Sequence, residues 1–106
     1  MDRYNWDNVP REELTPLITR QVIHTPSLTM LRIHFRKGAV LPMHHHVHDQ
    51  LTTVLSGRLR LESEGNTVEL GPGELARMGS DVPHAVEALE DTIAVDVFTP
   101  ARTDWQ

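Results

Sequence analysis

Four of the seven histidines of this 106-residue chain fall within five positions, from 44 to 48. Side chains two residues apart in an extended segment point the same way, so the imidazoles of His44 and His46 converge while His45 points away. Two imidazoles on one face supply half of a divalent metal site. His48 joins that face only if the strand stays regular. We therefore interpret this spacing as the start of a metal site, against the alternative of a solvated loop that happens to be rich in histidine.

The other ligands of such a site must come from elsewhere in the chain. Asp49 and Gln50 follow the histidine cluster directly and offer oxygen ligands. His84 lies far along the sequence, after a Val-Pro pair, and a barrel would bring it opposite the first two histidines. His24 and His34 stand alone on strand-like patterns, where a surface histidine or a hydrogen-bonded structural one is the better interpretation.

The elements that must position these side chains show the two-residue period of β-strands. Turn residues separate these segments, and no stretch offers a long apolar stripe at helical spacing. The segment from Glu12 to Arg20 is interrupted by Pro16 and would give one helical turn at most. Short strands with turns between them indicate an all-β sandwich or barrel. The clearest predicted strands cover residues 29–35, 58–62, 67–70, 85–89 and 92–98.

Length and composition point to one domain and exclude several kinds of site. We expect a single domain over residues 1–106, with an N-terminal arm (1–19), a barrel (20–99) and a C-terminal tail (100–106). The chain has no cysteine, which excludes disulfides, iron–sulfur clusters and thiolate metal sites and fits a reducing compartment.

Charge and hydropathy predict where the protein works and which partners it lacks. The formal charge is −5 and the Lys and Arg residues are scattered, which argues against a nucleic-acid partner. No run of 18 apolar residues exists to span a membrane. The first seven residues have no apolar stretch that would serve as a signal peptide, so we expect a cytoplasmic protein.

Two stretches of the chain resemble the paired motifs of the cupins. The first is Gly38-x5-His44-x-His46-x3-Gln50-x6-Gly57, and the second is Gly73-x9-Pro83-His84. The resemblance implies a double-stranded β-helix, a jelly-roll barrel, with a divalent transition metal held by His44, His46, Gln50 and His84. This sequence departs from the family pattern at three places: Gln50 stands where most cupins have Glu, Gly79-Ser80-Asp81 replaces a Pro-x-Gly turn, and Ala88 replaces an Asn.

Gln50 leaves the proposed metal site with a higher positive charge than a glutamate would. Three neutral imidazoles and a neutral amide leave the full charge of a divalent ion uncancelled, whereas a glutamate would halve it. Such a site should attract an anionic or polyhydroxylated ligand and polarise its oxygens strongly. It is less suited to an iron centre for oxygen chemistry, which favours a carboxylate ligand. The sequence does not choose among zinc, nickel, manganese and iron.

A second resemblance lies at the C-terminus. The run Asp96-Val97-Phe98-Thr99-Pro100-Ala101-Arg102-Thr103-Asp104-Trp105 is similar to the ending of the small cupins that ketonise unsaturated uronates during pectin and alginate breakdown. That family also carries His-Asp-Gln in its metal loop, here residues 48–50. In that family the residues matching Asp96, Phe98 and Arg102 are implicated in activity.

The physical properties of these three residues are compatible with such a role. Asp96 and Phe98 share one face of the last predicted strand, and an aspartate facing into a barrel is costly unless it is paired or functional. Near a cation it should stay ionised and serve as a base or bind a hydroxyl. Arg102 has the planar fork that suits a carboxylate. The alternatives are that Asp96 and Arg102 pair with each other and that Phe98 belongs to the core.

The resemblance predicts an enzyme that converts a 4,5-unsaturated monouronate, a small anionic sugar, to its linear keto form without net redox. One alternative is a quercetinase-like metal-dependent dioxygenase that uses the same four ligands. Another is a barrel that binds a small ligand or a metal without catalysis.

Three of the aromatic residues lie in the terminal segments: Tyr4, Trp6 and Trp105. Their rings are expected to pack either on their own barrel or on a second subunit. Because small cupins are commonly dimeric, the resemblance implies a homodimer to which the N-terminal arm contributes.

Overall fold

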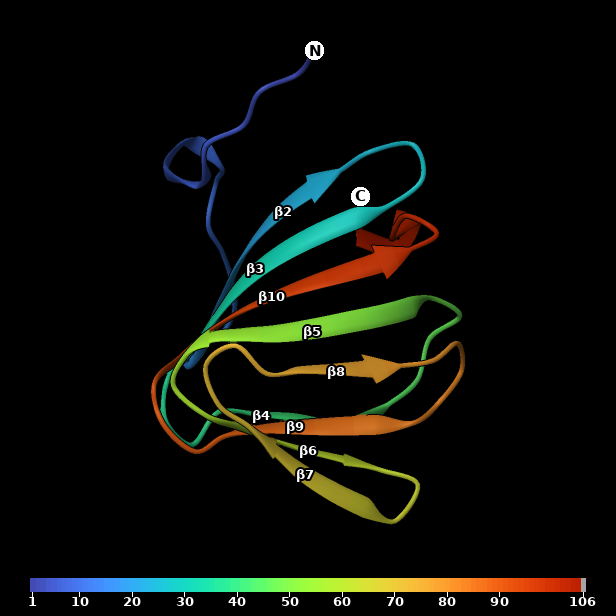
Figure 1. Ribbon diagram of the computed structural model, residues 1–106. Coiled ribbons are helices and arrows are strands. Elements are labelled where there is room, and N and C mark those ends of the chain that lie inside the picture. Colours follow the sequence, from blue (N-terminus) through green and yellow to red (C-terminus); the bar gives the residue numbers. More distant parts are fainter. Residues whose placement is uncertain (106) are drawn as a thin grey trace.

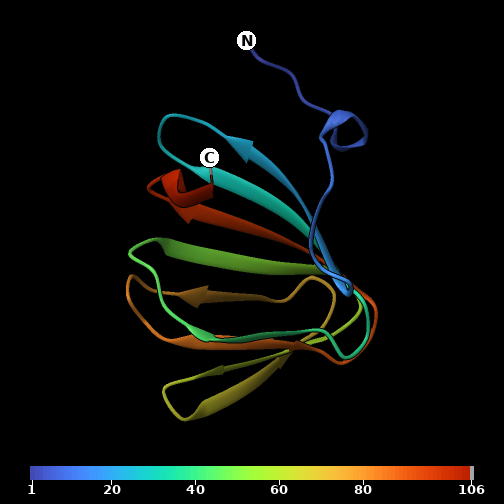
Figure 2. The same cartoon turned by 180° about the vertical axis from the view of Figure 1, so that it is seen from behind.

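The computed structural model describes residues 1–105, which form ten strands in two antiparallel sheets (Figures 1 and 2). One sheet has six strands in the order β1-β2-β3-β10-β5-β8, and the other has four in the order β4-β9-β6-β7. The strands are β1 (Glu12–Thr15), β2 (Ile18–His24), β3 (Thr29–Phe35), β4 (Val40–His44), β5 (Asp49–Ser56), β6 (Leu59–Ser63), β7 (Asn66–Leu70), β8 (Leu75–Met78), β9 (His84–Ala88) and β10 (Thr92–Thr99), with single-turn 3-10 helices η1 (Trp6–Asn8) and η2 (Thr103–Trp105).

The all-β jelly-roll prediction is confirmed, and all five predicted strands are present as β3, β6, β7, β9 and β10. The two-residue period is clearest in β3 and β10, whose burial alternates regularly along the strand. The strands β5 and β8 were not predicted. The inward face of β5 carries Gln50 and Thr52 beside Val54, so its burial alternates without a matching alternation of polarity. No helix of the described residues is long and apolar enough to cross a membrane.

The N-terminal segment differs from the sequence prediction. Residues 1–19 were expected as an arm, with one helical turn at most between Glu12 and Arg20. The structure instead pairs β1 with β2 there through a tight turn at Pro16, a strand pairing that was not predicted. Every residue of β1 is exposed. An edge strand that buries neither face carries no alternation of polarity to reveal it.

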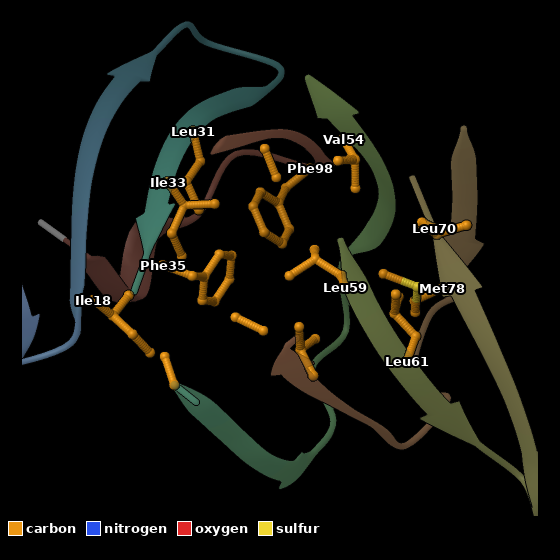
Figure 3. Close-up of a cluster of buried hydrophobic side chains, with 14 residues drawn as sticks. Ile18, Leu31, Ile33, Phe35, Val54, Leu59, Leu61, Leu70, Met78 and Phe98 are labelled. Atoms are coloured by element: carbon orange, nitrogen blue, oxygen red, sulfur yellow. The ribbon is translucent and has the colours of Figure 1, made fainter. Parts of the chain in front are cut away.

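The space between the sheets is apolar at one end and polar at the other. Figure 3 shows the apolar part, where Ile33 and Phe35 of β3 face Leu59 of β6. Along β10 the inward residues change from Ala94 to Asp96, and β5, its antiparallel neighbour, changes in step. The register pairs Ala94 with Val54, Asp96 with Thr52 and Phe98 with Gln50. The sheet therefore gathers its inward polar side chains at one end of the barrel.

Gly57, the last glycine of the first motif, is required by the turn between β5 and β6. Its φ is +88°, and an added Cβ would collide with the carbonyl oxygen of Asp91 and with Thr92. Gly65 has a similar φ of +79° with no atom near the Cβ position. A left-handed backbone alone costs an L-residue about 1 to 2 kcal/mol.

We predict that Gly57→Ala lowers the free energy of unfolding by about 3 kcal/mol or more, because the collision adds to the backbone strain. The matched control Gly65→Ala should lose only the backbone part. Urea denaturation of both variants measures the difference. Equal losses in the two variants would show that the turn at Gly57 has room for a side chain.

Candidate active site

Three histidines from different parts of the chain meet at the polar end of the barrel. His44 ends β4 and His84 begins β9, and the two are paired across neighbouring strands. His46 lies in the link from β4 to β5, which crosses from one sheet to the other (Figure 1). One nitrogen of each ring lies within 4.8 Å of the others. The convergence predicted from the His-x-His spacing and from a distant third histidine is therefore present, and this cluster can hold a metal ion.

Each of these rings is oriented by the backbone. In each ring, Nδ1 lies at hydrogen-bonding distance from a backbone carbonyl oxygen. For His44 and His84 this carbonyl belongs to the residue two positions earlier in the chain. For His46 it belongs to the residue two positions later. Carbonyl oxygens only accept, so Nδ1 must carry the hydrogen, and the lone pair of Nε2 is left for a metal. The three distances are 2.8 Å (His44 to Pro42), 3.0 Å (His46 to His48) and 2.9 Å (His84 to Val82).

Gln50 completes the donor set. Its amide nitrogen donates to Thr52 Oγ1 at 2.9 Å, which turns Oε1 toward the histidines, 3.0 Å from His46 Nε2. With the hydrogen of His46 on Nδ1, the two facing atoms both present lone pairs, which repel unless both bind the same cation. His84 Nε2 is also buried and without a hydrogen-bond partner among the described residues. Both observations fit a divalent ion held by His44, His46, His84 and Gln50.

The electrostatics of two of the histidines favour the neutral form that ligates a metal. Burial is the main cause that lowers the pKa of His46 and of His84 below the ordinary value of 6.5. The positive charge of Arg102 lowers both further. Neither imidazole therefore needs to lose a proton at neutral pH before it binds a metal.

Asp96 faces the same space from the middle of the six-stranded sheet. It is buried, and the amide of Gln50 donates to its Oδ2 at 3.4 Å. Its other oxygen, Oδ1, has no hydrogen-bond partner among the described residues. Burial raises the pKa of Asp96 from 3.8 to about 7, against the opposing effect of a hydrogen bond with Thr52. A carboxyl group with these properties can exchange a proton with a ligand.

The site opens into a pocket of about 310 Å³. Ligand pockets have volumes of roughly 300 to 1,000 Å³, so this one suits a single small ring. Its wall combines the polar groups with apolar side chains from both sheets, such as Leu31 and Val86. The site residues that line it are His44, His46, Gln50, His84, Asp96, Phe98 and Arg102.

Arg102 reaches the pocket from the segment after β10. Its backbone nitrogen donates to Thr29 Oγ1 at 2.8 Å, and its guanidinium donates through Nε and Nη2 to the two oxygens of Asp104 at 3.0 and 2.7 Å. The alternative that Asp96 pairs with Arg102 is wrong, because the partner of Arg102 is Asp104. Phe98 is buried in the core cluster, and it also lines the pocket with the guanidinium carbon of Arg102 5.0 Å from its ring centre.

The sequence reasoning missed three residues of this pocket. Thr52 orients Gln50, and its place two residues along the same strand face would have revealed it. The sequence indicated only that the Trp105 ring would pack on its own barrel or on a second subunit. In the structure it packs on its own barrel, with its ring centre 5.2 Å from that of Phe98. Arg20 lines the pocket from β2. The other histidines do not join the metal cluster: His45 is exposed beside Asp81, and His48 is buried with its ring 6.4 Å from that of Phe98.

Both the sequence and the structure of this chain are similar to those of known proteins. The sequence matches the family described as Cupin domain over residues 31–99. It is 34% identical over 102 residues to the pectin degradation protein KdgF of Dickeya dadantii, which covers 93% of each chain. Among solved structures, KdgF from a Halomonas species is 34% identical with a TM-score of 0.89, covering 94% of this chain and 95% of that one. An RmlC-like cupin from Shewanella frigidimarina is 26% identical with a TM-score of 0.91, covering 97% and 94%.

Proposed function

Because the chain belongs to the cupin domain family and is a relative of the pectin degradation protein KdgF, we propose that it acts in pectin breakdown. The reaction that we propose converts 4,5-unsaturated monouronates to their linear keto form. One observation carries the proposal: a histidine cluster, a buried carboxyl group with a free oxygen and a buried arginine all line one pocket the size of a monosaccharide.

The proposed cofactor is a divalent transition metal (zinc, nickel, manganese or iron) held by His44, His46, His84 and Gln50. When bound, it supplies a positive charge that polarises hydroxyl and keto oxygens and stabilises negative charge on them. The neutral glutamine leaves that charge undiminished, and the same positive charge would keep Asp96 ionised against the effect of burial.

The chain's own residues account for binding and proton transfer. Arg102 has hydrogen-bonding capacity beyond its contacts with Asp104 and holds the substrate carboxylate, while Phe98 forms the wall beneath it. Asp96 accepts the proton of the anomeric hydroxyl as the bond between C1 and the ring oxygen breaks. C1 becomes an aldehyde, and the ring oxygen stays on C5 as an enol oxygen. A proton returned to C4 then makes C5 a ketone, so atoms balance and nothing is oxidised.

The test is direct. Metal-loaded protein is incubated with a 4,5-unsaturated monouronate, and the ultraviolet absorbance of the enol ether is followed in parallel with dissolved oxygen. We expect the absorbance to fall faster than in the protein-free control, with no oxygen consumed. A rate equal to that control would contradict the proposal. Oxygen consumption with a flavonol would favour the dioxygenase instead, and binding without turnover would favour a non-catalytic barrel.

We also propose that the single domain of residues 1–106 forms a homodimer. The outward face of the six-stranded sheet carries Leu51 and Leu55 on β5 and Leu75 on the neighbouring β8, each about half exposed. Adjacent exposed leucines of this kind are typical of association surfaces. Light scattering during gel filtration should give twice the chain mass of 12.0 kDa. A mass of one chain at micromolar concentration would contradict the dimer.

A further inference from the structure

Two arginines from opposite ends of the chain meet at one tryptophan beside the pocket. The guanidinium carbon of Arg20 lies 4.3 Å from the ring centre of Trp105, and that of Arg102 lies 4.1 Å from the same centre. Both guanidinium groups therefore pack on the same indole ring. Both side chains line the pocket that contains the histidine cluster and Asp96.

The position of Arg20 follows from the strand that carries it. On β2, Arg20 shares the inward face with Ile18, which is almost fully buried. The Arg20 side chain is itself only 13% exposed. Its Nε donates to Glu12 Oε2 at 3.0 Å, and Glu12 is the residue paired with Arg20 across β1 and β2. The guanidinium is thus held in place through one of its edges, which leaves other N–H groups for a ligand.

Two guanidinium groups and one carboxyl group line the pocket. Among the described residues that line it, the arginines are Arg20 and Arg102, and the acidic residue is Asp96. The carboxylates that pair with the arginines, Glu12 and Asp104, are both about half exposed and do not line the pocket. Each guanidinium is therefore paired with a carboxylate outside the pocket, and its remaining N–H groups can bind an anion inside it.

We propose that Arg20 is a second substrate-binding residue, which forms with Arg102 a two-arginine site for the carboxylate of a uronic acid. This inference rests on the proposed function and adds the residue that sets its substrate class. Arg102 is matched by the family resemblance, whereas Arg20 follows from its place in the pocket. Charge-assisted hydrogen bonds from two forks discriminate strongly between a uronate and the neutral sugar that has a hydroxymethyl group instead.

Isothermal titration of the metal-loaded protein with D-galacturonate, a saturated and unreactive uronate, tests this site. The neutral comparison ligand is D-galactose. We expect wild-type protein to prefer galacturonate, and Arg20→Gln to weaken galacturonate binding about 10-fold or more. Arg20→Lys, which keeps the charge and loses the fork, should fall between them. Arg58→Gln, which removes an exposed arginine paired with Glu69 on the other sheet, should bind as wild type does.

Two further measurements keep the outcomes distinct. Metal content per chain, measured on each variant, shows that the pocket is folded, since the metal ligands lie on elements other than β2. If folded Arg20→Gln binds galacturonate within twofold of wild type, the assignment of Arg20 is overturned, whatever the turnover. If the expected affinities are found but wild-type protein does not turn over the unsaturated uronate, the proposed reaction fails and the two-arginine site stands.

Discussion

Replacing His84 by alanine is expected to remove most of the bound metal from the purified protein. His84 is 1% exposed, its Nδ1 is fixed by the Val82 carbonyl, and its Nε2 has no other hydrogen-bond partner among the described residues. Loss of one of four ligands should weaken metal binding about 100-fold or more, since even the outer hydrogen bonds of such sites contribute 10- to 100-fold. Mass spectrometry of metals after dialysis against a weak chelator measures the remaining content, and His46→Ala should behave in the same way.

The matched control for these variants is His45→Ala. His45 lies between two proposed ligands, but its side chain is exposed and its nearest charged neighbour is Asp81, 3.8 Å away. This variant should keep its metal and its activity. Full metal occupancy in both His46→Ala and His84→Ala would overturn the ligand assignment.

Replacing Asp96 by asparagine is expected to abolish most turnover without loss of metal. The amide keeps the size of the carboxyl group and its contact with Gln50, but it cannot accept or return a proton. General acid–base catalysis contributes about 100- to 10,000-fold in rate, so kcat on the unsaturated uronate should fall by a factor in that range. The loss should appear in kcat more than in KM, because Arg102 still holds the substrate.

The control for this variant is Asp49→Asn. Asp49 directly precedes the proposed ligand Gln50, but it is paired with Arg77 at 3.0 Å on the outer side of the sheet. It should retain wild-type kcat. If Asp96→Asn retained full kcat with full metal occupancy, Asp96 would have no part in proton transfer.

Spacing along the sequence was sufficient to predict that the histidines converge. The parity of His44 and His46 predicted that they converge, and the structure brings them together with His84 although His46 lies in a link rather than in a strand. Asp96 and Phe98 were predicted to share one face because β10 is regular, and they do. The prediction for Asp96 and Phe98 succeeds because a strand's two-residue period turns spacing directly into direction.

The residues that the sequence did not reveal depend on pairing between distant strands. Arg20 lies at the pocket because β2 pairs with β3 and because η2 folds back to place Trp105 against it, and neither contact has a local signal. The alternative that Asp96 pairs with Arg102 was wrong, since nothing in the sequence shows that the turn after β10 brings the Asp104 carboxylate to the Arg102 guanidinium. Edge strand β1 was missed for a different reason, since it buries no side chain and so carries no alternation of polarity.

The proposed site can be tested by a crystal structure of the metal-loaded protein with D-galacturonate, with anomalous scattering recorded at the absorption edge of the metal. We expect one anomalous peak, bonded to Nε2 of three histidines and to Oε1 of Gln50. The sugar should lie between this ion and Arg102, with Asp96 against one of its hydroxyl groups. The proposed ligands are His44, His46, His84 and Gln50. An ion bound elsewhere, or a uronate whose carboxylate points away from Arg102, would contradict the proposed site.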